Sequence, residues 1–392
     1  MEEMKGNGTI YTKKRSGKIY YEAQLSIGYD SKGKRIRKTI GGFDRKEVQQ
    51  KMNELRFKYQ IGFINTGGEL LLQDWYYTWL FEYRKHDLKP SSFQRYESLF
   101  RNYVLGTRIG LMKIAELKTI DYQRYLNELI NNGKSISIAK NVKKCLSACL
   151  NSAVDEDLIP KNYCSAVKLP AIQRVEKRYP VYTLNEQELI LNTLEFTPKD
   201  IAIKLAFATG MRLGEITALK WDDINLIDCT IDINKSLKQV QFIDGIGKDQ
   251  RRSELILQSP KTENSVRIIP IPATMNKILK DWKLEQKKLK LKNADVYIDM
   301  SFVFTNEFGA PFEPRVLPRR LETILKHLDI PYRKFHAIRH TYATRLFEAD
   351  VPVKTVQTLL GHKDISTTMN IYTHVSKDKK NEAVEKLNHL FG

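Results

Sequence analysis

The sequence of 392 residues has little cysteine and no long apolar run. Its four cysteines form no C-x-x-C pair, so we expect neither a disulfide framework nor a cysteine-based zinc site; they are Cys145, Cys149, Cys164 and Cys229. The simplest interpretation is reduced, mostly buried thiols in a cytoplasmic protein. No stretch of about 18 apolar residues occurs, and the N-terminus opens without an apolar segment. We therefore expect no transmembrane helix, no secretory signal and no membrane partner.

Two common catalytic motifs are missing as well. No G-x-x-x-x-G-K-[ST] loop occurs, so use of ATP is not indicated. His336 and His340 have the i, i+4 spacing of a zinc hydrolase helix, but Ala337 stands where such a helix carries its glutamate. We therefore expect no metal and no other cofactor.

The strongest compositional feature is an excess of positive charge. Lysine and arginine total 65 against 46 aspartates and glutamates, which gives a net charge of +19. The excess is concentrated near the N-terminus, because residues 1–60 carry +8 and residues 179–392 only +5. Such an excess attracts polyanions and favours nucleic acid as the partner. The alternative is a general contribution to solubility.

The pattern of apolar residues predicts several domains. Residues 18–27 and 34–40 alternate as strands, and Asp44 can cap a helix that runs to about residue 59. Residues 73–157 have helical periodicity with aromatic stripes, which are better explained as core than as a ligand site. Strands are also predicted at 230–233, 254–258 and 266–271, among segments of mostly helical pattern.

These patterns give a multidomain fold class. We expect a small N-terminal α+β module, a three-stranded sheet plus a helix, over residues 1–65. An all-α domain follows over 70–168, and a basic, proline-bracketed linker over 169–180. A mainly α domain with a small antiparallel sheet should occupy 181–392, where the stretch after residue 377 is amphipathic and predicts a tail helix.

Five short segments in the C-terminal part combine residue types suited to attack on a phosphodiester: 208–216, 260–262, 335–343, 359–362 and 370–374. Two guanidiniums can clamp the anionic oxygens, and Arg212 and Arg339 are the candidates. Imidazoles can donate hydrogen bonds or move protons, which suits His336 and His362.

Two further side chains complete the set. Lys261, in a turn between two predicted strands, can protonate a departing 5′ oxygen, and Tyr372 offers a phenol that can form a covalent phosphoester. Each residue has an ordinary explanation when taken alone. Lys261 could be a solvated turn residue, Tyr372 is one of 19 tyrosines, and Arg212 could simply pair with Glu215. The ordered combination favours catalysis.

That combination resembles the tyrosine recombinase family, the integrases of phages and conjugative transposons. The family pattern T-G-x-R-x-x-E is matched at 209–215, H-x-L-R-H at 336–340 with isoleucine in place of leucine, and L-G-H at 360–362. The resemblance covers essentially the whole chain in its three-domain layout. It implies a 3′-phosphotyrosyl intermediate made by a catalytic set, with two supporting residues: Arg212, Lys261, His336, Arg339, His362 and Tyr372, supported by Glu215 and His340.

The resemblance also implies the partners. Residues 1–65 would bind arm sites and 70–168 core sites on double-stranded DNA, with basic residues contacting it: Lys34, Arg35, Arg37, Lys38, Arg174, Lys177 and Arg178. A homo-tetramer on DNA, joined through the C-terminal tail, and accessory DNA-bending or excision proteins are expected. The function implied is a site-specific recombinase that integrates and excises a mobile genetic element. The alternatives are a type IB topoisomerase-like enzyme and a DNA-binding protein with a relict site.

Overall fold

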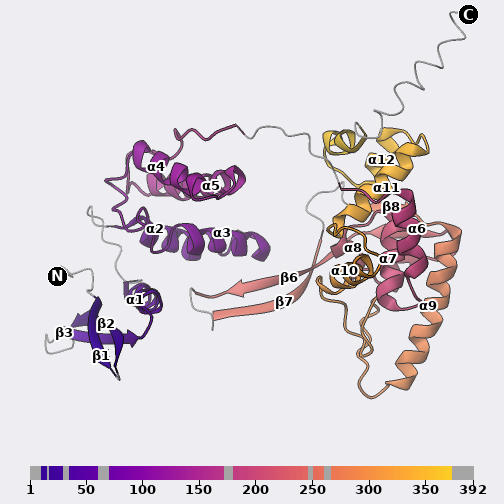
Figure 1. Cartoon of the computed structure of the whole chain (residues 1–392), viewed down its shortest axis with the longest axis horizontal. Coiled ribbons are helices and arrows are strands. Elements are labelled where there is room, and N and C mark those ends of the chain that lie inside the picture. Colours follow the sequence, from indigo (N-terminus) through magenta and orange to yellow (C-terminus); the bar gives the residue numbers. More distant parts are fainter. Residues whose placement is uncertain are drawn as a thin grey trace, which may run out of the picture. The chain divides into compact units, whose positions relative to one another are not determined.

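The computed structural model describes residues 10–15, 17–29, 35–60, 70–171, 180–245, 250–259 and 266–372. The chain divides into two compact units, whose elements are labelled in Figure 1. The first contains residues up to 173 together with 240–253, and the second contains 174–239 and the residues from 254 onward. Most of the predicted linker, residues 172–179, lies outside the described residues.

The first unit begins with a small sheet and a helix. Strands β1 (Ile10–Arg15), β2 (Lys18–Tyr29) and β3 (Arg35–Gly42) pair antiparallel in that order, and α1 (Arg45–Gln60) follows. The Asp44 carboxylate accepts a hydrogen bond from the amide of Lys46 at 2.7 Å, which satisfies an orphan donor of the first turn. Val48 and Met52 of α1 are buried with Ala23 of β2. The predicted α+β module is confirmed.

The rest of the first unit is mostly helical, as predicted. It contains α2 (Leu72–Thr78), a π-helical segment (Trp79–Arg84), α3 (Pro90–Tyr103), α4 (Thr119–Asn131) and α5 (Ile136–Asp155). Pro90 occupies the first position of α3, where its missing N–H leaves no helical hydrogen bond unmade. Most aromatic residues of α2 and α3 are buried in one core with α5, and the three cysteines of this region are buried thiols.

A hairpin of β6 (Ser236–Ile243) and β7 (Arg251–Gln258) is shared between the units, and its tip belongs to the first. Ile243 joins the helical core of that unit. Glu97 of α3, which is 1% exposed, accepts hydrogen bonds from Nε of Arg101 at 3.2 Å and from Nη2 of Arg251 at 2.6 Å. The tip is therefore tied to α3 by a buried carboxylate between two arginines.

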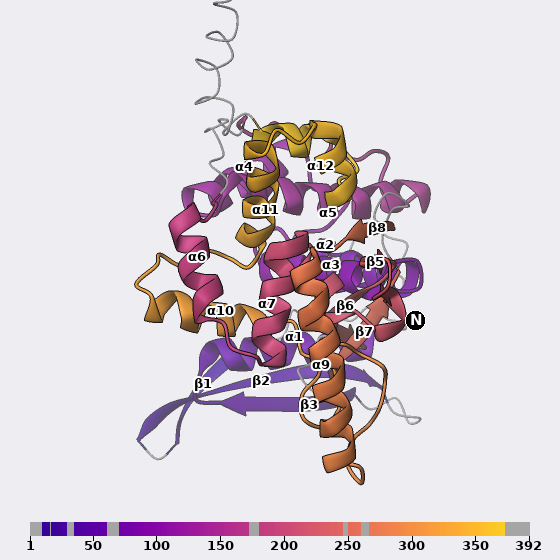
Figure 2. The ribbon, with the colours of Figure 1, turned by 90° about the vertical axis from the view of Figure 1, so that its right-hand side faces the viewer.

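The second unit surrounds the buried helix α7 (Pro198–Thr209), which packs against its neighbours α9, α10 and α11 (Figure 2). Its other helices are α6 (Leu184–Thr193), α8 (Leu213–Thr217), α9 (Ala273–Lys292), α10 (Val316–His327), α11 (His336–Glu348) and α12 (Val353–Leu360). A small antiparallel sheet has the order β4 (Ile224–Asn225), β5 (Thr230–Ile233), β8 (Arg267–Pro270). A mainly α architecture with a small sheet is confirmed.

One strand prediction was incomplete. The three predicted strands exist, as β5, β7 and β8, but the sequence analysis did not identify β6. Because β6 is the partner of β7 while β8 pairs with β5, the two strands that flank residues 259–266 belong to different sheets. The strands β7 and β8 therefore do not pair with each other, and Lys261 between them lies outside the described residues.

No helix in the described ranges combines the length and the apolar character that crossing a bilayer requires.

Candidate active site

Arg212 is placed by a tight turn at the end of α7. That helix ends at Gly210, whose φ of +62° is left-handed. A β-carbon at this position would lie 2.4 Å from the ring of Tyr342, so only glycine fits both the backbone and the space. The chain then turns at once into α8, with Arg212 as its N-cap residue. The T-G-x-R motif therefore encodes a helix end, a turn and a helix start in four residues.

Glu215 orients Arg212 from the first turn of α8. One carboxylate oxygen accepts the backbone N–H of Arg212 at 2.8 Å, and the other accepts Nη1 of the same residue at 2.8 Å. Burial alone would raise the pKa of Glu215, but hydrogen bonding and charge from Arg267, together with the charge of Arg212, lower it to about 2. Glu215 is therefore an anion at neutral pH, and Arg212 keeps a partner while its side chain stays 36% exposed.

Helix α11 contributes His336, Arg339 and His340, which share one helical face through their i, i+3 and i+4 spacing. The two imidazole rings meet edge to face with centroids 4.7 Å apart. Arg339 is 1% exposed; its Nη1 donates to the carbonyl of Gly210 at 2.9 Å and its Nη2 to the carbonyl of Leu360. Arg339 thus joins α11 to the end of α7 and to the end of α12.

At the end of α12, three consecutive carbonyl oxygens each accept a hydrogen bond from a different arginine. The carbonyl of Leu359 accepts Nε of Arg267 at 2.8 Å, that of Leu360 accepts Arg339, and that of Gly361 accepts Nη2 of Arg212 at 3.0 Å. A helix C-terminus is suited to this role because its last carbonyls have no intrahelical donor and carry partial negative charge. We call this set the carbonyl cradle.

His362 follows the carbonyl cradle directly. Gly361 has a φ of +63° and ends α12, so the chain reverses and brings His362 beside the arginines. Its Nδ1 lies 2.9 Å from the hydroxyl of the fully buried Thr368, and its backbone exchanges hydrogen bonds with Gln357. The ring is therefore fixed with Nδ1 engaged.

The three histidines are neutral at physiological pH. Burial, and then the charges of Arg339 and Arg212, lower the pKa of His362 to about 3. Burial, His336 and Arg339 lower the pKa of His340 to about 4. The pKa of His336 is lowered by burial and by the same two arginines. The charge of a neighbouring guanidinium thus contributes to the lowered pKa of each imidazole.

One predicted residue, Tyr372, is described but does not join this cluster. Tyr372 lies in a helical segment that covers residues 365–372 of the described chain, and its ring packs edge-on against Phe347 with centroids 5.1 Å apart. Within the described part of the chain its hydroxyl makes no hydrogen bond with the arginines or histidines of the site. Lys261 lies outside the described residues. The structure therefore assembles Arg212, His336, Arg339 and His362, with Glu215 and His340 beside them.

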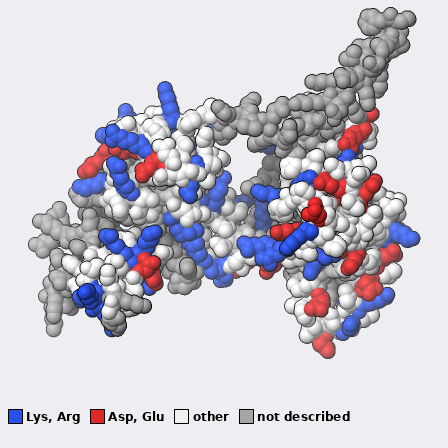
Figure 3. All heavy atoms as spheres, in the orientation of Figure 1, with Lys and Arg blue, Asp and Glu red and all other residues white. Residues whose placement is uncertain are grey.

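The predicted DNA-contacting residues fall on two segments. Arg35, Arg37 and Lys38 lie on β3, paired with β2, whereas Lys34 and the linker residues Arg174, Lys177 and Arg178 lie outside the described residues. On the face seen in Figure 3, basic side chains predominate over the first unit, and the second unit carries both signs interleaved.

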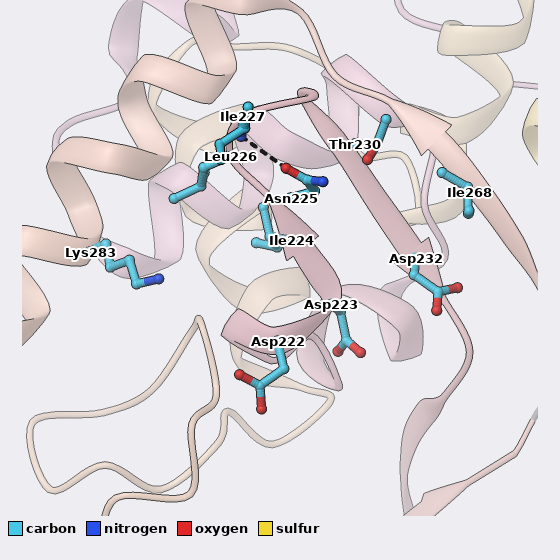
Figure 4. Close-up of a pocket in the computed structure, with 10 residues that line it drawn as sticks. All are labelled: Asp222, Asp223, Ile224, Asn225, Leu226, Ile227, Thr230, Asp232, Ile268 and Lys283. Atoms are coloured by element: carbon cyan, nitrogen blue, oxygen red, sulfur yellow. Dashed lines mark hydrogen bonds between the residues drawn. The ribbon is translucent and has the colours of Figure 1, made fainter.

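A hollow of about 530 Å³ opens elsewhere on the second unit (Figure 4). It is lined by Asp222, Asp223 and Asp232 with Ile227, Ile268 and others, and it contains none of the cluster residues. Asp223 already pairs with Lys235 at 2.6 Å and accepts the amide of Lys220, so this carboxylate has a structural role. Among the described residues, no group of three or more histidines, cysteines, aspartates or glutamates is arranged to hold a metal ion.

Sequence reasoning missed two residues of the site, Arg267 and Thr368. Arg267 was detectable from strand alternation, since it shares the inward face of β8 with the buried Ile269, while Ile268 between them is exposed. Thr368 gave no signal, because its contact with His362 depends on how the chain folds back after Gly361.

Comparisons with known proteins identify the fold and the family. Residues 181–379 match the phage integrase family, and residues 71–130 match the phage integrase N-terminal SAM-like domain. A tyrosine recombinase XerC-like protein of Caldanaerobacter subterraneus is 40% identical over 96% of this chain and 98% of its own length. The ICEBs1 integrase of Bacillus subtilis is 25% identical over 94% and 97%, respectively.

Solved structures share the fold. The Tn1549 transposon integrase, in complex with a circular intermediate DNA, superposes with a TM-score of 0.63 at 20% identity, over 81% of this chain and 99% of that one. A lambda integrase tetramer bound to a Holliday junction gives 0.54 at 20% identity, over 90% and 92%. The chain belongs to the phage integrase family and is a tyrosine recombinase, a DNA strand-transferring enzyme of site-specific recombination.

Proposed function

We propose that the cluster at the carbonyl cradle holds the scissile phosphodiester and that Tyr372 attacks it. The observation that carries this assignment is the convergence of Arg212, His336, Arg339 and His362 from three segments far apart in the sequence. A phosphodiester gains charge in its transition state, and fixed guanidiniums stabilise that charge without a reorganisation cost during the reaction.

The proposed reaction is balanced transesterification. The phenolic oxygen of Tyr372 bonds to phosphorus, the 5′ oxygen leaves, and a 3′-phosphotyrosyl link results. We assign the phenolic proton to the neutral imidazole of His336 and the proton gained by the 5′ oxygen to the ammonium of Lys261. The 5′ hydroxyl of another strand then reverses these steps and releases the tyrosine, so the phosphoester count is unchanged and no ATP is consumed.

A buried donor supports a phosphate ligand here. Nε of Arg339 is buried and has no hydrogen-bond partner among the described residues. An unpaired buried donor on a charged group is costly, by about 1–3 kcal/mol. A phosphate oxygen entering between Arg339 and the half-exposed Arg212 would supply the acceptor. Attack further requires the Tyr372 ring to leave Phe347 and turn toward that phosphate.

The domain assignment follows from the same proposal. Residues 1–65 form the arm-binding module, 70–168 the core-binding domain, 169–180 the linker and 181–392 the catalytic domain with its tail. The protein would act on mobile-element DNA in the cytoplasm as a tetramer joined through the tail, with accessory DNA-bending or excision proteins. The related lambda integrase forms a tetramer on a Holliday junction, which supports this assembly.

A nicked duplex tests the chemistry. Built from the element's own end sequence, with the nick just 3′ of the cleavage point, it loses its short leaving strand and traps the covalent adduct. Wild type should form the adduct in the presence of a chelator, and Tyr372→Phe should not. The exposed Tyr332→Phe serves as the matched control and should react normally. An adduct that persists in Tyr372→Phe would refute the nucleophile assignment.

Two further variants test the remaining roles. Lys261→Ala should be slow on ordinary DNA and recover on a 5′-thio substrate, whose leaving group needs no strong acid; absence of recovery removes the general-acid role. Deletion of residues 1–65 should abolish arm-site binding while core cleavage survives. Relaxation of supercoiled DNA that lacks the element's sites, at a rate equal to that on the sites themselves, would favour the topoisomerase alternative.

A further inference from the structure

Arg267 is a buried arginine next to the site, and it contacts the residues that hold Arg212. Its side chain, on the inward face of β8, is 5% exposed. Nη1 lies 3.2 Å from one oxygen of Glu215 and Nη2 lies 2.9 Å from the other, while Nε donates to the carbonyl of Leu359 at 2.8 Å. The guanidinium therefore binds a carboxylate in bidentate fashion and also holds one position of the carbonyl cradle.

Glu215 stands between two arginines. Each of its oxygens accepts one hydrogen bond from Arg212 and one from Arg267, and its side chain is 6% exposed. Removing Arg267 would leave each buried oxygen of Glu215 with one of its two hydrogen-bond donors. The carboxylate would then be free to shift toward Arg212 or toward water, and the direction of the Arg212 guanidinium would shift with it.

Arg267 also connects Glu215 to the segment that carries His362. Its Nε fixes the carbonyl of Leu359, and Arg212 donates to the carbonyl of Gly361 two residues later. The two arginines and Glu215 thus form a closed loop of contacts that includes the end of α12. A change in any member would therefore disturb the position of Arg212 relative to the end of α12.

We propose that Arg267 is a positioning residue for strand transfer, which fixes Glu215 and the end of α12 so that Arg212 meets the scissile phosphate. This inference rests on the assignment of Arg212 to the phosphate. Arg267 contacts no DNA itself, because its guanidinium is enclosed by Glu215 and the end of α12.

The second unit supplies a matched control for a purely structural role. Arg320 of α10 forms a comparable bidentate pair, with Nε and Nη2 both 2.7 Å from the oxygens of the fully buried Asp200 at the start of α7. This pair holds α10 to α7 and makes no contact with the carbonyl cradle. Loss of Arg320 should therefore destabilise the unit without altering the geometry at Arg212.

The experiment compares Arg267→Met with Arg320→Met in the full chain on the nicked duplex, at a temperature where thermal unfolding shows both to be folded. For Arg267→Met we expect adduct formation about 10²-fold slower, as for loss of one transition-state donor, with the Kd for DNA changed less than about threefold. For Arg320→Met we expect an unchanged rate. Equal rates for the two variants would overturn the proposal.

A double-mutant cycle separates Arg267 from its target. If Arg267 acts through Arg212, then Arg267→Met added to Arg212→Ala should slow the reaction less than about threefold further. If the rate losses of the two single variants multiply in the double variant, the proposal is overturned. Should Arg212→Ala alone cleave normally, the assignment of Arg212 fails instead, a separate and recognisable result.

Arg267→Lys keeps the test decisive if the methionine variant does not fold. An ammonium retains the charge but cannot span both oxygens of Glu215 and the carbonyl of Leu359 together. We expect a rate about tenfold below wild type with the Kd unchanged. A wild-type rate for Arg267→Lys would show that charge alone suffices and would overturn the positioning role.

Discussion

The hydroxyl of Thr368 lies 2.9 Å from Nδ1 of His362, on the opposite edge of the ring from Nε2. Because the imidazole is neutral, the proton on one nitrogen decides what the other can do. The hydroxyl of Thr368 can serve either tautomer, as donor to a bare Nδ1 or as acceptor from a protonated one, so the contact fixes the orientation of the ring. Thr368 is fully buried, so water does not compete for this contact.

Thr368→Val should slow adduct formation by about 10–10²-fold, since valine has the same shape without the hydroxyl and positioned proton donors and acceptors contribute at that level. The pH profile of the rate should shift at the same time, because Nδ1 of His362 would lose its hydrogen-bond partner. Thr368→Ser should keep most activity, and the neighbouring exposed Thr367→Val should behave as wild type. The measurement is single-turnover cleavage of the nicked duplex. Unaltered kinetics in Thr368→Val would show that the contact is incidental.

Gly210→Ala should destabilise the second unit by about 1–3 kcal/mol, because it combines a left-handed φ with a β-carbon 2.4 Å from the Tyr342 ring. Gly133→Ala is the matched control: its φ is +78° and its β-carbon would meet open space, so only the backbone strain remains. Denaturant unfolding, followed by a probe in each unit, measures both. Equal losses of unfolding free energy in the two variants would mean that Tyr342 moves aside readily.

Stability should fall as the pH is lowered from about 6.5 toward 4. The pKa values of His340 and His362 are about 4 and about 3 in the folded protein, below the ordinary value for histidine of 6.5. In this window the unfolded chain binds protons that the folded chain does not, so acid favours unfolding. The contribution of Glu215 is present above pH 4.5 and is lost only as the pH falls toward about 2.

Paired substitutions test that assignment. The double variant His340→Gln and His362→Asn should flatten the dependence of the unfolding midpoint on pH between 6.5 and 4. The exposed His327→Gln on α10 should leave the slope as it is in wild type. His336, whose pKa is also lowered, remains in the double variant, so only a slope as steep as that of wild type would place the titrating groups elsewhere.

Glu97→Ala should release the hairpin tip within the first unit. The substitution leaves Arg251, 15% exposed, without its buried carboxylate, and breaking such a pair costs about 3 kcal/mol. Amide hydrogen exchange over 240–245 and 250–253 should accelerate. The control is the exposed Glu128→Ala on α4, which should change neither exchange nor stability. Unchanged protection of the tip in Glu97→Ala would show that Ile243 and its apolar contacts suffice.

The sequence predicted local features well. Caps, helical stripes and the T-G-x-R, H-x-x-R-H and L-G-H segments are short-range patterns, and the elements that carry them formed as predicted. Pairing between strands is long-range, and β6, the partner of β7, was not among the predicted strands. Strand alternation could have placed Arg267 on an inward face, but it gives no sign of the carboxylate that the guanidinium meets across the fold.

The carbonyl cradle could not be predicted because its acceptors are main-chain atoms, which every residue type has. Arg212 and Arg339 were recognised as a pair suited to phosphate, but the groups that hold them in the folded protein lie at Leu359–Gly361. Only the geometry of a helix end shows that these oxygens point toward the guanidiniums.

The same fact has an evolutionary consequence. Since the acceptors belong to the backbone, most substitutions at Leu359 would leave the three arginine contacts in place, and the constraint on Leu360 comes from its own packing in the core. Adding or deleting one residue in α12 would instead rotate each carbonyl by about 100° around the helix axis and aim it away from its arginine. In descendants of this protein, the length of the segment from Val353 to His362 should therefore be preserved more strictly than its composition.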